Sequence, residues 1–185
     1  MEGVPLKISV LDNTSEICKK VATQFAQKPP STTNSRILQV SIVQNIELWR
    51  KFKLELKKGL TTHSLWHGTR GTDPEIVCKK GLNINYSNGG MWGKGIYFAV
   101  NANYSCPNYS HIVPNLNNTF EVFLADVVTG NYIDTKTNND KNLREPPIIP
   151  GTSKHYDAVK GHTNGSDVFI VYKNESTYPG LLIKY

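Results

Sequence analysis

A histidine followed directly by a glycine, His67 and Gly68, stands in an apolar stretch of the chain. An imidazole can donate or accept a hydrogen bond, and a glycine lets a ligand approach the backbone closely. Downstream stand Tyr97, Tyr104 and Tyr109, whose rings could offer flat apolar faces to a planar aromatic ligand. Taken singly, each of these residues is more often an ordinary core or surface residue, so the pattern indicates a site only if the fold gathers them.

A cluster of glycines at positions 89–95 has the composition of a phosphate-binding loop but not its spacing. The P-loop pattern requires glycine where this chain has Asn88, and serine or threonine where it has Gly95. A dinucleotide-binding fingerprint follows a strand and opens a helix, whereas this cluster precedes the strand-like run 96–99. On its own residues the cluster therefore predicts a turn that enters a strand.

The chain has 185 residues, of which 38% are hydrophobic and 19% are charged. This excludes the weakly hydrophobic, highly charged class of disordered proteins. The longest apolar run, residues 168–172, is far shorter than the roughly 20 residues of a membrane-spanning helix. The N-terminus lacks the pattern of a secretion signal, so we expect an intracellular protein, with nucleus and cytosol not distinguished.

Cysteine and charge usage exclude further classes. The three cysteines are widely spaced and odd in number, which argues against a disulfide framework, and they form no C-x-x-C pair for zinc. The net charge is +6, with Lys-Lys pairs near the expected ends of helices, where they complement the helix dipoles. No basic stripe interleaved with aromatic residues supports nucleic-acid binding. A mildly positive field would still attract an anionic small molecule such as a dinucleotide.

Hydrophobic periodicity predicts helices early in the chain and strands late. The expected helices cover residues 13–27, 46–58 and 74–80, and the expected strands cover 36–43, 95–100, 120–128, 155–159, 167–172 and 181–185. Residues 129–154 are expected to form a long surface loop with a short strand at 132–135. Because helices precede strands without βαβ alternation, we expect an α+β fold with mostly antiparallel sheets.

Capping residues mark the expected helix starts. Asn13, Asn45 and Asp73 can each accept a hydrogen bond from the first turn, and Asn13 with Glu16 matches a capping-box pattern. In the third helix, Ile76, Val77 and, as a further candidate, Cys78 are expected to face inward.

Two of these motifs occur together in a known family. His67-Gly68-Thr69 followed by the segment 93–99 (GKGIYFA) resembles the catalytic domain of the poly(ADP-ribose) polymerase superfamily. The resemblance extends over most of the chain through similar segments at 42–49, 100–105, 169–172 and 178–183. It is strongest for the mono-ADP-ribosylating, macrodomain-associated branch.

The resemblance implies an ADP-ribosyltransferase fold, in which two mainly antiparallel sheets form a split β-sandwich with flanking helices and a crevice for NAD+ between them. It implies one catalytic domain over residues 1–185, without a helical autoinhibitory domain. NAD+ would be a consumed substrate, and no metal is implied. The partners would be NAD+ and acceptor proteins, with automodification as one option, and we expect a monomer with no nucleic-acid or membrane partner.

Carried over residue by residue, the resemblance assigns one side of the NAD+ site. His67 is similar to the histidine that hydrogen-bonds the ribose 2′-hydroxyl, and Gly68 to the glycine whose backbone N–H and C=O hold the nicotinamide carboxamide. Ser105 is similar to the serine that completes the hydrogen bonds of that carboxamide. Thr69 and Arg70 belong to the same NAD+-binding segment, with Arg70 directed at the adenosine or pyrophosphate part.

The resemblance also implies that two tyrosine rings enclose the nicotinamide. Tyr97, the second member of the family's His-Tyr-Glu triad, would stack on one face, and Phe98 and Ala99 follow it in the same NAD+-binding segment. Tyr109 would stack on the other face, with Tyr104 as the alternative because the spacing to this second ring differs from that of relatives. Residues 83–92 would form the donor loop over NAD+, and residues near 131–154 would lie toward the acceptor.

A valine stands at the third triad position. Val168 aligns with the glutamate that polymerases use to activate the growing chain, and a valine can neither accept a hydrogen bond nor act as a general base. We therefore expect one transfer of ADP-ribose, by substitution at the nicotinamide ribose carbon through an oxocarbenium-like transition state. A catalytically silent NAD+-binding module is the alternative. A polymerase that uses Asp167 is less favoured, because strand alternation points Asp167 away from the site if Val168 points into it.

Overall fold

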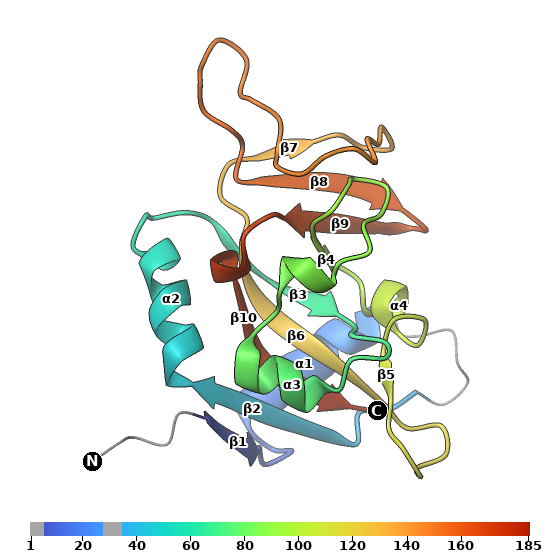
Figure 1. Cartoon of the computed structure of the whole chain (residues 1–185). Coiled ribbons are helices and arrows are strands. Elements are labelled where there is room, and N and C mark those ends of the chain that lie inside the picture. The colour runs from blue at the N-terminus through green and yellow to red at the C-terminus, as the bar shows by residue number, and fades with distance from the viewer. Residues whose placement is uncertain (1–5, 28–34) are drawn as a thin grey trace.

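A single hydrogen-bonded path of strands forms the centre of the computed structural model, which describes residues 6–27 and 35–185 (Figure 1). The order along the path is β1-β2-β10-β6-β3-β4-β9-β8-β7, with β5 paired to β6. Every pair is antiparallel except β7 with β8. The strands are β1 (Leu6–Val10), β2 (Gln39–Asn45), β3 (Thr62–His67), β4 (Ile96–Ala99), β5 (His111–Ile112), β6 (Phe120–Val128), β7 (Tyr132–Asp134), β8 (Ala158–Thr163), β9 (Ser166–Val171) and β10 (Thr177–Lys184).

The path divides into two halves that meet at one residue pair. Strands β3 and β4 pair only at Trp66 and Ala99, whereas β3 pairs with β6 along its whole length and β4 does the same with β9. In Figure 1 the strands β7, β8 and β9 lie above the others and run in a different direction. The predicted α+β class with mostly antiparallel pairing is confirmed. The two sheets that the resemblance implies are here two halves of one hydrogen-bonded sheet, joined at this narrow contact.

Helices cover both faces of the lower half. They are α1 (Glu16–Gln27), α2 (Ile46–Leu56), α3 (Pro74–Lys80) and the short α4 (Ala102–Ser105), with 3₁₀ turns η1 (Ile84–Tyr86) and η2 (Asn174–Ser176). Phe25 of α1 lies against Trp66 of β3, with ring centroids 5.7 Å apart, while Val77 of α3 shares a core cluster with Leu65. Successive residues of a strand point to opposite faces, so α1 and α3 pack on opposite sides of β3.

Two of the three predicted helix caps are confirmed. The side chain of Asn45 accepts a hydrogen bond from the N–H of Leu48 at 3.1 Å, and the carboxylate of Asp73 accepts one from the N–H of Glu75 at 2.8 Å. The prediction for Asn13 is wrong. Residues 12–15 form a turn before α1 begins, and the hydroxyl of Ser15 accepts from the first turn of the helix.

Other differences follow from long-range contacts. The strand expected at 155–159 is β8, which begins three residues later because residues 155–157 bond to the neighbouring loop. The strand expected at 36–43 is β2, shifted toward the C-terminus by a few residues. Ile76 is 42% exposed and does not face inward, since Val77 occupies the face toward the sheet. The sequence analysis missed β1, β3, β5 and α4, among which β3 carries His67.

Asn45 joins three elements, so its replacement should cost more than the loss of an ordinary helix cap. While it caps α2, its amide donates to the carbonyls of Cys78 (3.0 Å) and Lys79 (3.1 Å) at the end of α3. We expect Asn45→Ala to lower the free energy of unfolding by about 3 kcal/mol, against about 1 kcal/mol for Asp73→Ala, in urea denaturation.

Asn45→Asp is the matched control for this prediction. It keeps an acceptor for the first turn of α2 but cannot donate to the two carbonyls, so it should be destabilised as well. If Asn45→Ala costs no more than Asp73→Ala, the contacts between α2 and α3 contribute nothing to stability.

Candidate active site

The junction of β3 and β4 carries the histidine that was predicted to bind ribose. His67 is the last residue of β3, and its Nδ1 lies 2.8 Å from the backbone oxygen of Tyr97. Its ring lies against Phe98, with centroids 5.1 Å apart. Because a carbonyl oxygen only accepts, Nδ1 carries the proton, and Nε2 of the neutral ring is left as an acceptor. The strand junction therefore sets the tautomer of His67.

The surroundings of His67 also hold it neutral. Burial lowers the pKa of its imidazole below the usual value, and the hydrogen bond to the Tyr97 carbonyl opposes this shift only in part. A neutral ring with a free acceptor nitrogen suits a ribose hydroxyl, which can donate a proton to it.

Gly68 follows at a point where no side chain fits. A Cβ atom on this residue would collide with the carbonyl oxygen of Tyr109 and lie 2.8 Å from the backbone nitrogen of Ser110. Within residues 6–27 and 35–185, no hydrogen bond forms to the N–H or the C=O of Gly68. One donor and one acceptor side by side match the carbonyl oxygen and one of the two N–H groups of a primary carboxamide.

The tyrosines that follow gather into one group. Tyr104 and Tyr109 stack with ring centroids 5.4 Å apart and planes 13° from parallel, and the guanidinium of Arg70 lies 4.3 Å from the centroid of Tyr109. Burial raises the pKa of Tyr104, with smaller contributions from Tyr109 and Tyr97 nearby. The assignment of Tyr109, with Tyr104 as the alternative, to the second face of nicotinamide stays a prediction, because the two rings stack on each other.

Ser105 and Thr69 lie close to this group. Ser105 is buried at the end of α4, and its hydroxyl donates to the carbonyl of Trp66 at 3.3 Å, one residue before His67. The hydroxyl of Thr69 donates to the carbonyl of Thr72 at 2.7 Å and closes the turn after Gly68. The structure thus places both beside the segment that was predicted to hold NAD+.

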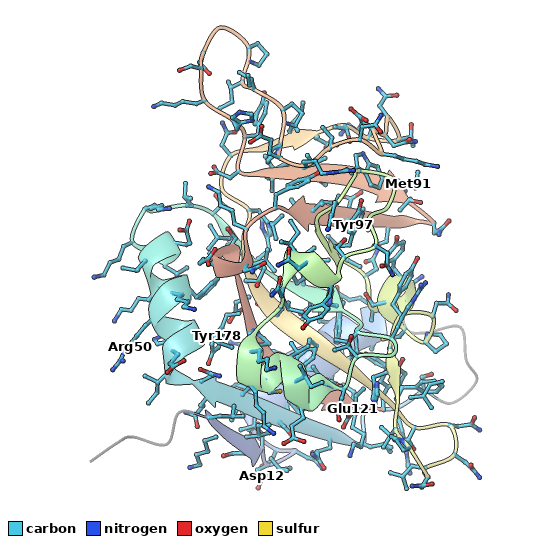
Figure 2. All side chains as sticks on the ribbon, viewed as in Figure 1. Asp12, Arg50, Met91, Tyr97, Glu121 and Tyr178 are labelled. Carbon is cyan, nitrogen blue, oxygen red and sulfur yellow. The ribbon has the colours of Figure 1, made fainter. Side chains whose placement is uncertain are left out.

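Tyr97 holds the predicted donor loop. Its hydroxyl accepts from the N–H of Trp92 (2.9 Å) and donates to the carbonyl of Gly93 (2.8 Å). Gly90 lies so close to the ring that a Cβ atom there would come within 2.9 Å of Cζ. Burial raises the pKa of Tyr97 to about 12, so the phenol keeps its proton. In Figure 2, Tyr97 and Met91 of this loop both lie in the upper half of the molecule.

Two aromatic residues that the sequence analysis missed also fix this loop. The indole nitrogen of Trp92 donates to the Thr135 hydroxyl and the Asn138 carbonyl, both at 2.8 Å, and the Tyr172 hydroxyl donates to the Trp92 carbonyl at 2.6 Å. The indole occupies the space that a side chain at Gly161 would fill. A glycine inside a strand marks such a close approach. Gly161 was therefore the residue in the sequence that could have indicated this contact.

Val168 lies on the same face of the upper half as Tyr97. The register pairs Tyr97 with Ile170 and Ala99 with Val168, and Gly161 flanks Val168 on β8. Val168 is fully buried in the apolar cluster that also contains Trp92 and Tyr97. The third triad position is therefore closed as well as apolar.

The register excludes Asp167 as a substitute for the missing glutamate. Asp167 pairs with His162 on the opposite face, where its carboxylate lies 2.8 Å from Nζ of Lys160 and 2.7 Å from Nδ1 of His162. These hydrogen bonds lower the pKa of Asp167. The carboxylate is thus engaged in an ion pair away from Tyr97.

The described residues contain neither a cluster of metal-ligating side chains nor a membrane-spanning helix. Across residues 6–27 and 35–185, no three His, Cys, Asp or Glu side chains are grouped so as to hold a metal ion. Over the same ranges, no helix has the length and apolar character to cross a membrane.

Comparison with known proteins identifies the family. The profile of the poly(ADP-ribose) polymerase catalytic domain matches residues 14–185. The chain belongs to this family. The match begins just before α1 and includes the β3–β4 junction and all strands from β2 to β10.

Among curated proteins, the chain is 32% identical over 161 residues to a probable poly [ADP-ribose] polymerase of Dictyostelium discoideum, covering 80% of this chain and 44% of the relative. It is 31% identical over 176 residues to the human protein mono-ADP-ribosyltransferase PARP14, covering 89% of this chain and 9% of the relative. It is 28% identical over 210 residues to the mouse protein mono-ADP-ribosyltransferase PARP11, covering 98% and 61%. The chain spans less than two thirds of each of these relatives.

The neutral state of His67 predicts how stability depends on pH. In the unfolded chain its pKa returns to about 6.5, so as the pH falls below that value the unfolded state binds a proton before the folded state does. Stability from His67 is therefore complete above about pH 6.5 and is lost as the pH falls. The difference in unfolding free energy between wild type and His67→Asn, measured at neutral and at mildly acidic pH, should show this loss.

NMR titration of the ring protons gives the direct check. His67 should titrate below the usual histidine pKa of about 6.5, and titration at or above that value would contradict its neutral state in the folded protein.

Introducing the missing glutamate should damage the fold instead of creating a polymerase. Val168→Glu places a carboxylate in a fully buried apolar cluster, which should cost several kcal/mol of unfolding free energy. Val168→Ala is the matched control and should cost about 2 kcal/mol. A Val168→Glu protein with the stability of wild type that makes chains of ADP-ribose would show that this position is open to the site.

Proposed function

We propose that this chain is a mono-ADP-ribosyltransferase, which transfers one ADP-ribose from NAD+ to a side chain of an acceptor protein and releases nicotinamide. The observation that carries the proposal is the junction of His67, Gly68 and Tyr97. One strand contact has three features within a few residues of it: a neutral histidine with an accepting Nε2, a backbone donor and acceptor that no described residue bonds, and a fixed aromatic ring. Membership of the family and similarity to two protein mono-ADP-ribosyltransferases support the same reaction.

In this proposal, the chain's own residues position NAD+ and leave the bond-making to the acceptor. The bond between the ribose carbon and nicotinamide breaks, and its electron pair leaves with nicotinamide, which becomes neutral. A nucleophilic atom of the acceptor supplies the electron pair of the new bond, and any proton it carries passes to water. His67 would hold the ribose hydroxyl, Gly68 the carboxamide and Tyr97 one face of the ring, so that their contribution is orientation.

The buried valine supports transfer of a single unit. Chain growth requires a group that polarises the hydroxyl of the previous ADP-ribose, and Val168 offers none. The same valine is the observation that favours the second candidate, a silent module that binds NAD+ without transfer. The two candidates differ in one measurable event, the release of nicotinamide.

Incubation of the protein with labelled NAD+ tests the proposal. We expect nicotinamide release together with one discrete labelled band on a gel, from the protein itself or from added acceptor proteins. A ladder of bands would indicate a polymerase. Binding of NAD+ without nicotinamide release would indicate the silent module, and either result would overturn the proposal.

Point variants then test the assigned residues. His67→Ala should reduce labelling by about a hundredfold or more, since it removes the ribose contact, and Tyr97→Ala should do the same because it removes both the ring and the anchor of the donor loop. Tyr97→Phe keeps the ring and loses only the anchor, so it should retain more activity than Tyr97→Ala. His63→Ala, on the same strand but bonded to Thr129, is the matched control and should label like wild type. Full activity in His67→Ala and Tyr97→Ala would contradict the site.

A further inference from the structure

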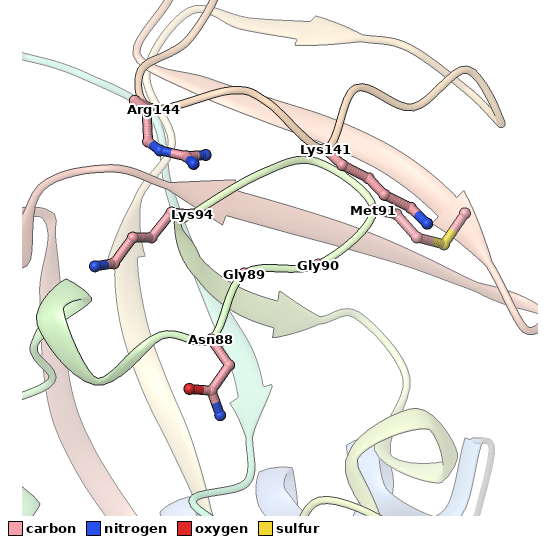
Figure 3. Close-up of a pocket in the computed structure, with 7 residues that line it drawn as sticks. All are labelled: Asn88, Gly89, Gly90, Met91, Lys94, Lys141 and Arg144. Atoms are coloured by element: carbon pink, nitrogen blue, oxygen red, sulfur yellow. The ribbon is translucent and has the colours of Figure 1, made fainter.

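A cavity of about 490 Å³ opens between the donor loop and the loop that joins β7 to β8 (Figure 3). It is lined by residues 88–91 of the donor loop together with Lys94, Lys141 and Arg144. We call it the basic cavity, because three of its lining side chains are cations and none is a carboxylate. In Figure 3, Arg144 and Lys94 lie at one end of it, and Lys141 lies beside Met91 at the other.

The three cations have no acidic partner in the part of the chain that the structure describes. No carboxylate lies within 4.0 Å of Lys94, Lys141 or Arg144 there, and Arg144 bonds only to two backbone carbonyls beside it in sequence. The neighbouring acids are engaged elsewhere: Asp140 accepts from a backbone N–H at 2.9 Å, and Glu145 lies 3.9 Å from a histidine ring nitrogen. No ion pair among the described residues therefore offsets the positive charge of these three side chains.

The cavity is built on fixed backbone. The N–H of Lys94 donates to the carbonyl of Leu143 at 2.9 Å, and Gly93 packs so tightly on Leu143 that no side chain fits between the loops. The wall formed by Gly90 lies directly against the ring of Tyr97. Only one backbone layer thus separates the basic cavity from the ring that was assigned to nicotinamide.

We propose that the basic cavity docks an acidic stretch of the acceptor protein, and thereby selects which protein segments are presented to the NAD+ site. This inference rests on the proposed function, which it deepens by naming the chemical class of the acceptor. Carboxylates of a peptide would pair with Lys141 and Arg144, while the peptide backbone lies along the glycines of the donor loop.

An acidic peptide fits the cavity better than a nucleic acid does. Proteins that bind single strands stack bases on aromatic rings, and no aromatic side chain lines the basic cavity. A second cavity beside α1 also has lysines, but there Lys19 is paired with Glu16 at 2.8 Å, so that its charge is partly compensated. The basic cavity differs in that its cations lie next to the donor loop and form no ion pair with a described residue.

The test measures peptide binding in the absence of NAD+. A fluorescently labelled peptide of alternating glutamate and serine is titrated with the protein, and anisotropy reports its affinity. We expect the double variant Lys141→Gln with Arg144→Gln to weaken binding roughly three- to tenfold, the range for two exposed ion pairs. Binding should also weaken as salt is raised from about 50 to about 500 mM.

The matched control is the double variant Arg50→Gln with Lys53→Gln. It removes the same two kinds of charge from the exposed face of α2, away from the cavity (Figure 2), and should change the affinity less than twofold. If both double variants lose the same amount of peptide affinity, the loss is due to net charge alone and the proposal is overturned. Equal binding of a peptide with glutamine in place of glutamate, or no binding of the glutamate peptide, would also overturn it.

A short single-stranded oligonucleotide serves as competitor. If it binds more tightly than the glutamate peptide and depends on Lys141 and Arg144, the cavity is a nucleic-acid surface and the proposal is wrong. Failure of the proposed function would look different, because it would be the absence of nicotinamide release from NAD+ by the wild-type protein, which peptide binding does not require.

Discussion

The contact between the side chain of His67 and the backbone carbonyl of Tyr97 is the constraint on which the site depends. It lies beside the one residue pair that joins the two halves of the strand path. Strands β3 and β4 separate at this point. The side chain of His67 therefore bonds the carbonyl of Tyr97, which would pair with a backbone N–H in a continuous ladder. The same contact fixes which nitrogen of His67 can accept a hydrogen bond and joins β3 to Tyr97, whose hydroxyl holds the donor loop.

The donor loop is rich in glycine yet firmly held, and the reasons lie outside the loop. Hydroxyls of Tyr97 and Tyr172 bond to its backbone, and the indole of Trp92 packs over Gly161. Gly90 and Gly93 serve close contact here, since side chains at these two positions would collide with the ring of Tyr97 or the backbone of Leu143. A rigid loop gives both of its faces a defined shape, one toward Tyr97 and one toward the basic cavity.

Valine at the third triad position is part of a wider apolar environment. Val168 lies in a row with Ala99 and Gly161, under the cover of Trp92, and the nearest acidic residue in sequence is held on the other face by Lys160. The loss of the glutamate is thus accompanied by packing that would penalise a charge at this place. In the proposed function, His67, Gly68 and Tyr97 therefore contribute by orienting NAD+.

Periodicity, capping residues and a specific resemblance are local properties of the chain, so the α+β class, the caps at Asn45 and Asp73 and the site motifs could be predicted from the amino-acid sequence. Three features follow only from the folded arrangement: the place of β3, the tautomer of His67 and the clamping of the donor loop by Trp92 and Tyr172. Each of these depends on contacts between residues far apart in sequence, such as His67 with Tyr97 or Trp92 with Gly161. No local pattern encodes the strand register that brings such residues together.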